Sequence, residues 1–166
     1  MKYTQENGNI ILKDYDSFII SQTLECGQCF NFNKLGEEDY IVTAHKKALH
    51  IYQSGDAIVF EDTSINEFET IWLNYFDLNR DYNEIKKLLA DEDEILKGAV
   101  EYAPGIRIIN QEFFQCLISF IISQNNNIPR IKGIVSRLCE HFGEKIPGGF
   151  AFPAPEVLAN CTVEDL

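Results

Sequence analysis

The segment QEFFQCLISFIISQNNNIPR, residues 111–130, contains the sharpest change of character in the 166-residue sequence. Apolar side chains occupy almost every side of a helix axis over residues 111–124, which predicts a central helix packed on all sides. Three asparagines then interrupt the pattern, and residues 128–142 restart an apolar 3.6-residue period that a glycine ends. Asn127 is a natural N-cap, and Pro129 suits a first helical turn. We therefore expect a polar turn held between two helices.

Upstream of this segment, residues 8–61 alternate short β-rich runs with turn residues and contain no useful helical period. The turn residues lie at 35–38 and 54–56. The expected strands are Ile10–Lys13, Ser17–Leu24, Gln28–Asn33, Tyr40–Ala44, Leu49–Gln53 and Ala57–Glu61. This pattern predicts an antiparallel meander with one face covered.

A helical period begins after Asp62, with Ser64 as a plausible N-cap. Further short helices are expected at Tyr82–Leu89 and Ile95–Tyr102. The apolar stripes of these helices are typical of core faces and carry no chemistry. The sequence thus predicts an α+β fold, with an antiparallel β-sheet domain at residues 1–80 and part of an all-α domain at residues 81–166.

The composition, 45% apolar, is typical of a globular chain that buries one sizeable core. The sequence has no apolar run of about eighteen residues and no signal-peptide layout at its start, so we expect a cytoplasmic protein without a membrane partner. A net charge of -12 argues at first against nucleic acid, but residues 105–145 hold five basic residues against three acidic ones, a net +2. We infer that the acidic residues lie on other, solvated faces.

The sequence has five cysteines, an odd number, and three of them stand alone in apolar segments. This pattern favours buried, reduced thiols over a disulfide framework. Cys26 and Cys29 form a C-x-x-C pattern. A zinc site would need a second ligand pair, and a redox motif of the thioredoxin type would open a helix after a strand. Neither context is present, so no metal or redox cofactor is expected.

Two separate parts of the sequence, taken together, resemble one known family. The first part is residues 23–30, TLECGQCF, and the second comprises Gly105-Ile106-Arg107, Gln111-Glu112, residues 116–123, the triple asparagine with Ile128 and Arg130, and residues 131–143. Both are similar, in the same order, to motifs of the 8-oxoguanine DNA glycosylases of the helix-hairpin-helix superfamily. The similarity extends over nearly all of the chain and supports the α+β prediction.

This resemblance implies a role for each matching residue in base-excision DNA repair. Gly27 matches the residue whose backbone carbonyl accepts the hydrogen that 8-oxoguanine, unlike guanine, carries on N7. Asn125 matches the residue that fills the space left by the flipped base, and Arg130 matches the one that recognises the opposite cytosine. Asn126 is a weaker candidate for DNA contact, while Asn127 is expected mainly to cap the helix. The implied partner is duplex DNA containing 8-oxoguanine opposite cytosine, bound by a monomer.

The family is a bifunctional glycosylase and apurinic-site lyase, in which a lysine amine attacks the sugar and an aspartate assists. Those two residues follow a helix-hairpin-helix and are expected beyond Leu166, so no catalytic residue is assigned in this chain. Lys145 is a poor substitute because it precedes the glycines of Ile146–Phe150, whereas the family's lysine follows its hairpin. The resemblance therefore implies the front part of such an enzyme, inactive by itself.

Other interpretations remain open at this stage. The asparagine corner could serve only to cap and turn the chain, and Gly27 could only relieve a strand bulge. An alkylated-base DNA glycosylase shares the β-then-helical layout, although the segments around Gly27 and from Asn125 to Arg130 disfavour it. A non-catalytic DNA-binding or interaction module is the remaining alternative.

Overall fold

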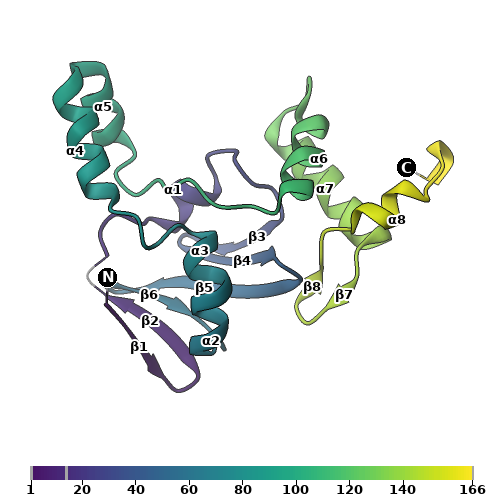
Figure 1. Cartoon of the computed structure of the whole chain (residues 1–166), viewed down its shortest axis with the longest axis horizontal. Coiled ribbons are helices and arrows are strands. Elements are labelled where there is room, and N and C mark those ends of the chain that lie inside the picture. The colour runs from purple at the N-terminus through teal and green to yellow at the C-terminus, as the bar shows by residue number, and fades with distance from the viewer. Residues whose placement is uncertain (1, 14, 166) are drawn as a thin grey trace.

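The computed structural model describes residues 2–13 and 15–165 and confirms the α+β class (Figure 1). Within these residues, six strands form one antiparallel sheet in the order β1-β2-β6-β5-β4-β3. The strands are β1 (Lys2–Glu6), β2 (Asn9–Lys13), β3 (Phe32–Gly36), β4 (Asp39–Ala44), β5 (Lys47–Ser54) and β6 (Ala57–Phe60). A small separate hairpin consists of β7 (Lys145–Ile146) and β8 (Gly149–Phe150).

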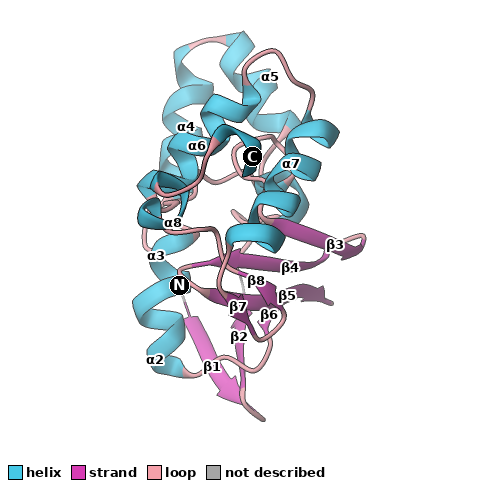
Figure 2. Ribbon diagram, turned by 90° about the vertical axis from the view of Figure 1, so that its right-hand side faces the viewer, coloured by secondary structure: helices cyan, strands magenta, loops and turns pink. Residues whose placement is uncertain are grey.

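The helices lie beside the sheet and beyond it. They are α1 (Ile20–Leu24), α2 (Ile65–Glu67), the π-helical turn η1 (Phe68–Trp72), α3 (Leu73–Tyr75), α4 (Tyr82–Glu92), α5 (Glu94–Tyr102), α6 (Phe113–Ser123), α7 (Ile128–Phe142), α8 (Pro155–Ala159) and the 3-10 turn η2 (Val163–Asp165). Figure 2 shows the strands in the lower part of the molecule, α2 and α3 beside the sheet, and α4 to α7 above it. In Figure 1, α4 and α5 rise on one side and α6 and α7 on the other, with α1 between their bases.

The meander prediction is confirmed for β3 to β6, which pair consecutively, but β2 pairs with β6 instead of β3. The additional strand β1 was not predicted. It pairs with β2 through a two-residue turn at Asn7 and Gly8, both of which have positive φ angles of 51° and 86°. Positive φ at both positions gives the turn the twist of an antiparallel hairpin, and Asn-Gly adopts it readily.

Two predicted strands in the connection from β2 to β3 are wrong. Ser17–Leu24 contains the helix α1 instead of a strand, and Gln28–Asn33 becomes extended only from Phe32. The β-branched residues of the first segment favour a strand locally. Tertiary contact overrides that preference, because the Thr23 hydroxyl donates to the Gly105 carbonyl at 3.1 Å and the Ile19 amide donates to the same oxygen at 2.9 Å.

The core lies between one face of the sheet and the helical segment from α2 to α3, as the covered-face prediction requires. Trp72 is fully buried, and its neighbours Phe68 and Phe76 are equally inaccessible to solvent. The predicted N-cap is confirmed, since the Ser64 hydroxyl accepts a hydrogen bond from the Glu67 amide at 3.1 Å. The sheet and this segment therefore form one apolar unit.

The helix predicted at 111–124 is present as α6, but it is not packed on all sides. Phe113 is 80% exposed and Phe120 is 65% exposed, while the buried residues of α6 are Gln115 and Ser119. An apolar composition predicts burial only where partners are present, and the described residues do not include enough partners to cover this helix. Its apolar face is an exposed surface of this chain.

Arg107 joins segments that lie far apart in the sequence, and its side chain is fully buried. Its guanidinium donates to the carbonyl oxygens of Ser17 at 3.2 Å, Phe76 at 2.9 Å, Arg80 at 3.1 Å, and Asp77. A guanidinium has five N–H donors and stays charged in proteins, so burial is tolerated only when acceptors surround it. Arg107 thereby joins the segment before α1 to the chain that leaves α3.

The immediate surroundings of Arg107 strengthen this junction. The guanidinium carbon lies 3.9 Å from the ring centre of Tyr82 and 5.2 Å from that of Tyr15, distances at which a cation is attracted to an aromatic face. The Arg107 amide also donates to the Thr23 hydroxyl at 3.2 Å, which connects α1 to the segment that contains Arg107. One arginine therefore sets the relative positions of α1, α3 and α4.

His50 lies between two carboxylates on the outer face of the sheet. Its Nδ1 is 2.6 Å from Glu61 Oε2, and its Nε2 is 2.7 Å from Asp39 Oδ1. Burial alone would lower the pKa of His50, but the hydrogen bonds and charges of Glu61 and Asp39 outweigh burial and raise it. The ring thus links β4 and β5 to the residue that follows β6.

No helix in the described part of the chain is long and apolar enough to cross a membrane.

We expect Arg107→Lys to lower the free energy of unfolding by about 3 kcal/mol or more, because three ammonium donors cannot satisfy carbonyls arranged around a planar guanidinium. Urea denaturation at 25 °C measures this value. Arg137→Lys, on the exposed side of α7, is the matched control and should change stability by less than about 0.5 kcal/mol. A loss below about 1 kcal/mol at Arg107 would contradict its role as a junction.

The raised pKa of His50 predicts pH-dependent stability. A group whose pKa is higher in the folded state stabilises the fold fully below its unfolded pKa of about 6.5 and loses that contribution as pH rises through the folded pKa. The stability difference between the wild type and His50→Gln should therefore be larger at pH 5.5 than at pH 8.5. A difference that stays constant over this range would rule out the contribution.

Candidate nucleic-acid interface

The asparagine turn, defined as residues 125–127, connects α6 to α7 and is built by its own side chains. The Asn127 carboxamide oxygen accepts a hydrogen bond from the Arg130 amide at 3.0 Å, so the predicted N-cap is confirmed. The Asn126 side chain donates to the Ile122 carbonyl at 2.6 Å and closes the end of α6. Two of the three asparagines therefore hold the turn.

Asn125 differs from its neighbours. Its φ angle is +55°, in the left-handed region that asparagine tolerates better than most residues. Its side chain is exposed and, among the described residues, has no hydrogen-bond partner. Arg130 is also exposed, and its guanidinium forms no ion pair within the described part of the chain. The turn thus presents one carboxamide and one guanidinium to solvent.

Gly27 lies in the turn that follows α1, with a φ angle of +87°. This value explains the residue type, because a side chain is strained in that region and glycine is not. In the described residues, no hydrogen-bond donor reaches the Gly27 carbonyl oxygen. The carbonyl is therefore left without a partner in a turn of fixed geometry.

Two glutamines fix the Gly27 turn, a role that the sequence analysis did not assign. The Gln28 side chain donates to the carbonyls of Thr23 at 2.8 Å and Arg107 at 2.7 Å, and it accepts from the Ile109 amide at 3.0 Å. Gln111 donates to the Gln28 carbonyl at 2.6 Å. Both glutamines lie within the two motifs that resemble the glycosylase family. Their side chains bond to backbone about eighty residues away, and only the folded structure shows these partners.

The structure brings the Gly27 turn and the asparagine turn together, although about a hundred residues separate them in sequence. Ile128 and Lys132 of α7 line a pocket of about 130 Å³ together with Gly27, Cys29 and other residues of the first motif. Deeper in the structure, Phe30 packs in one buried cluster with Ile131. The start of α7, directly after the asparagine turn, therefore lies beside Gly27, although Asn125 and Arg130 do not line this pocket.

The charge prediction for residues 105–145 needs a correction. Arg107 contributes to the count of +2, but its buried guanidinium faces carbonyl oxygens and cannot meet a phosphate. The basic groups near the two turns are instead Arg130, Lys132 and Lys34. Lys132 lies 3.7 Å from the ring centre of Phe32, and burial lowers the pKa of its ammonium. Lys34 forms an ion pair with Glu25 at 2.6 Å.

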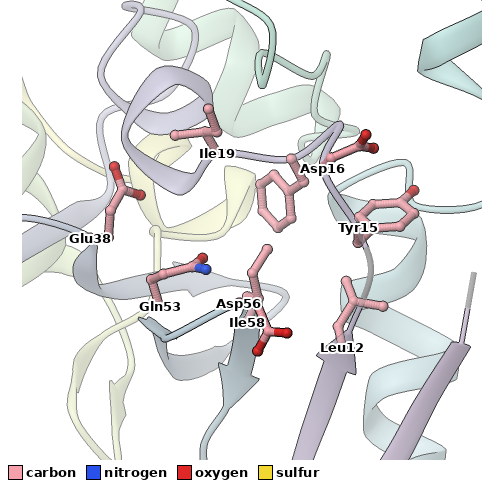
Figure 3. A pocket seen from close by; sticks show the side chains of 9 residues that line it. Leu12, Tyr15, Asp16, Ile19, Glu38, Gln53, Asp56 and Ile58 are labelled. Atoms are coloured by element: carbon pink, nitrogen blue, oxygen red, sulfur yellow. The ribbon is translucent and has the colours of Figure 1, made fainter.

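A larger pocket, of about 520 Å³, lies elsewhere and has the wrong charge for DNA (Figure 3). Its lining includes the carboxylates of Asp16, Glu38 and Asp56, and it includes no lysine or arginine. Phosphate binding depends on cationic side chains, so these carboxylates oppose it. None of the lining residues belongs to the Gly27 turn or the asparagine turn.

The C-x-x-C pattern does not form a shared site. Cys29 is buried, and burial raises the pKa of its thiol to about 12, whereas Cys26 is exposed. A metal ligand or redox nucleophile must be a thiolate. The described residues also contain no group of three or more His, Cys, Asp or Glu side chains placed to hold a metal ion. The predicted burial is wrong for Cys116, which is exposed.

Lys145 lies on β7, after the end of α7, whereas the asparagine turn lies at the start of α7. A fifteen-residue helix is about 22 Å long, which separates this amine from the turn. Figure 1 likewise shows β7 and β8 at the opposite end of α7 from the turn. The position of Lys145 gives it no role in the candidate interface.

Comparison with known proteins finds one family. The family model described as 8-oxoguanine DNA glycosylase, N-terminal domain, matches residues 10–117. The N-glycosylase/DNA lyase of Saccharomyces cerevisiae is 46% identical over 65 residues, which is 36% of this chain and 17% of the yeast protein. N-glycosylase/DNA lyase OGG1 of Arabidopsis thaliana is 29% identical over 154 residues, which is 86% of this chain and 42% of the plant protein.

Solved structures agree with this result over almost the whole chain. The 8-oxoguanine glycosylase/lyase of Clostridium acetobutylicum, in complex with double-stranded DNA containing cytosine opposite 8-oxoguanine, superposes with a TM-score of 0.92 and 36% identity. MBOgg1 in complex with a low-affinity DNA ligand gives a TM-score of 0.91 and 36% identity. Each match covers 99% of this chain and 58% of the other, so the chain spans less than two thirds of these relatives.

The turn geometry predicts different effects for two adjacent asparagines. Asn127→Ala removes the cap and should lower the free energy of unfolding by about 1 kcal/mol in urea denaturation. Asn125→Gly should leave stability within about 0.5 kcal/mol of the wild type, because glycine accepts the φ angle of +55°. Equal losses at both positions would refute this division of roles.

Proposed function

Because the chain belongs to the 8-oxoguanine DNA glycosylase family, we propose that it probes duplex DNA and recognises 8-oxoguanine in base-excision repair. The observation that carries this proposal is the position of Gly27 beside the start of α7, directly after the asparagine turn. Among the described residues, the Gly27 carbonyl and the Asn125 carboxamide have no hydrogen-bond partner. One such group can recognise a flipped base, and the other can fill the space that the base leaves. The substrate class and the partner, double-stranded DNA with the lesion opposite cytosine, are part of the proposal.

Lesion recognition is assigned to the Gly27 carbonyl. Guanine presents N7 as a hydrogen-bond acceptor, whereas 8-oxoguanine carries a hydrogen on N7. A fixed carbonyl therefore attracts the lesion and repels the normal base, in the same way that an unpaired buried group penalises the wrong substrate. The left-handed φ angle of Gly27 and the hydrogen bonds of the Gln28 side chain support this assignment, because the bonds hold the base of the turn that carries this carbonyl.

Duplex probing is assigned to Asn125 and Arg130. Turning a base out of the stack costs about a few kcal/mol, and a side chain that fills the empty space offsets part of that cost. Asn125 suits this role because its carboxamide is exposed on a rigid turn. The Arg130 guanidinium offers paired donors to the ring acceptors of the unpaired cytosine. Asn126 holds the turn through Ile122, so its contact with DNA is a secondary proposal.

For the complete enzyme we propose glycosylase and apurinic-site lyase activity, with a lysine nucleophile and an assisting aspartate outside residues 1–166. No metal or redox cofactor enters this reaction. The proposal keeps the division into a β-sheet domain at 1–80 and part of a helical glycosylase domain at 81–166. A cytoplasmic location is proposed from the free thiols, which are typical of a reducing compartment.

The proposal predicts that this chain binds a duplex with 8-oxoguanine opposite cytosine more tightly than the same duplex with guanine. Fluorescence anisotropy at fixed salt measures both affinities. Asn125→Gly keeps the turn and should weaken binding to the lesion duplex by about tenfold, while Arg130→Gln should reduce the preference for cytosine opposite the lesion. Asn127→Ser retains a capping oxygen and is the matched control, with unchanged affinity expected.

Each alternative function gives a different result in this experiment. Equal affinity for damaged and undamaged duplexes would indicate a non-catalytic DNA-binding module. A preference for 7-methylguanine over 8-oxoguanine would indicate an alkylated-base glycosylase. A borohydride-trapped adduct between this chain and lesion DNA would show that the nucleophile lies within residues 1–166.

A further inference from the structure

We propose that Ile128 is a positioning residue that keeps the Gly27 carbonyl in its recognition orientation, so that discrimination against guanine depends on a side chain of the asparagine-turn helix. This inference rests on the proposed function, and it adds a specificity residue to it. The observation behind it is the position of Ile128, the first residue of α7, beside Gly27.

A Cβ atom placed on Gly27 would lie 3.5 Å from the Cδ1 atom of Ile128, an ordinary van der Waals distance. Among the described residues, and apart from its two chain neighbours, no other residue comes within 4 Å of that position. Ile128 is 47% exposed, so its side chain lies over the Gly27 turn at the rim of the pocket. The isoleucine is therefore the nearest neighbour on the side of Gly27 where a side chain would project.

The rest of α7 fixes where Ile128 lies. One helical turn further along, Ile131 packs against Phe30, and the Lys132 ammonium lies over the Phe32 ring at 3.7 Å. Side chains at positions i, i+3 and i+4 share one face of a helix. Ile128, Ile131 and Lys132 therefore face the residues that follow Gly27, and the first of them reaches Gly27 itself.

The orientation of this peptide decides which base is accepted. Glycine populates several backbone regions at little cost, and rotation of the peptide between Gly27 and Gln28 would replace the carbonyl by an N–H group. An N–H at this position would donate to N7 of guanine and would not accept from 8-oxoguanine. Loss of a steric restraint on Gly27 would therefore reduce, or reverse, the preference for the lesion.

The Gln28 side chain does not make this restraint redundant. Its bonds to Thr23, Arg107 and Ile109 fix the side chain of Gln28 and hold the base of the turn. They do not contact Gly27. Ile128 is the neighbour that limits motion of the glycine from the solvent side, where the base would enter.

The first test needs no DNA. Ile128→Val removes only the Cδ1 atom that lies over Gly27, and Ile134→Val removes the same group from the far side of α7, where Ile134 lines a separate groove with Arg137. The ¹⁵N order parameters of Gly27 and Gln28 measured by NMR should fall from about 0.85, the value of rigid backbone, toward about 0.6 in Ile128→Val alone. Unchanged order parameters, or equal losses in both variants, would overturn the positioning role.

The second test measures recognition with the same pair of variants. The ratio of affinities for 8-oxoguanine and guanine duplexes should fall by about fivefold in Ile128→Val, with little change in affinity for the guanine duplex. Ile134→Val should keep the wild-type ratio. A wild-type chain that binds both duplexes equally refutes the proposed function, whereas a preserved ratio in Ile128→Val refutes only the role of Ile128.

Discussion

The buried guanidinium of Arg107 is the constraint on which the arrangement of this chain depends. A charge that cannot be neutralised is enclosed by the fold, so the backbone carbonyls around it must stay in place. These carbonyls come from Ser17 before α1 and from Phe76 to Arg80 after α3. The Arg107 carbonyl also accepts a hydrogen bond from the Gln28 side chain. The Gly27 turn is therefore held by the same residue that joins the sheet to the helices.

The proposed recognition of DNA depends on two turns that different hydrogen bonds hold in place. The Gly27 turn is fixed from below by Gln28, and the asparagine turn is fixed by its own caps at Asn126 and Asn127. The helix α7 connects them, because its apolar face packs along the chain that follows Gly27. Under the proposed function, α7 places the duplex-probing turn beside the carbonyl that would distinguish the lesion. An acidic side chain, Glu25, does line the pocket beside Gly27, but Lys34 forms an ion pair with it at 2.6 Å.

Sequence reasoning succeeded where the signal is local and failed where distant contacts decide. The cap at Asn127 and the strands β4 to β6 follow from residue type and alternation. The Asn7-Gly8 hairpin also had a local signal, which was overlooked. Ile20–Leu24 forms a helix within a predicted strand, and the Gly105 carbonyl holds its start. Arg107 is buried and Phe113 is exposed, contrary to what their residue types indicate. Both outcomes depend on the whole fold and have no signature in the sequence.

The central claim, that the Gly27 turn and the asparagine turn read DNA together, can be tested by mapping backbone amide shifts by NMR. The ¹⁵N-labelled chain is titrated with a duplex that contains 8-oxoguanine opposite cytosine, and with the matching undamaged duplex. The account predicts that the lesion duplex perturbs the amides of residues 27–29 and 124–131 in the same titration, while those of residues 53–58 at the acidic pocket stay unchanged. Perturbation of only one turn, or a map centred on the acidic pocket or on α4 and α5, would contradict it.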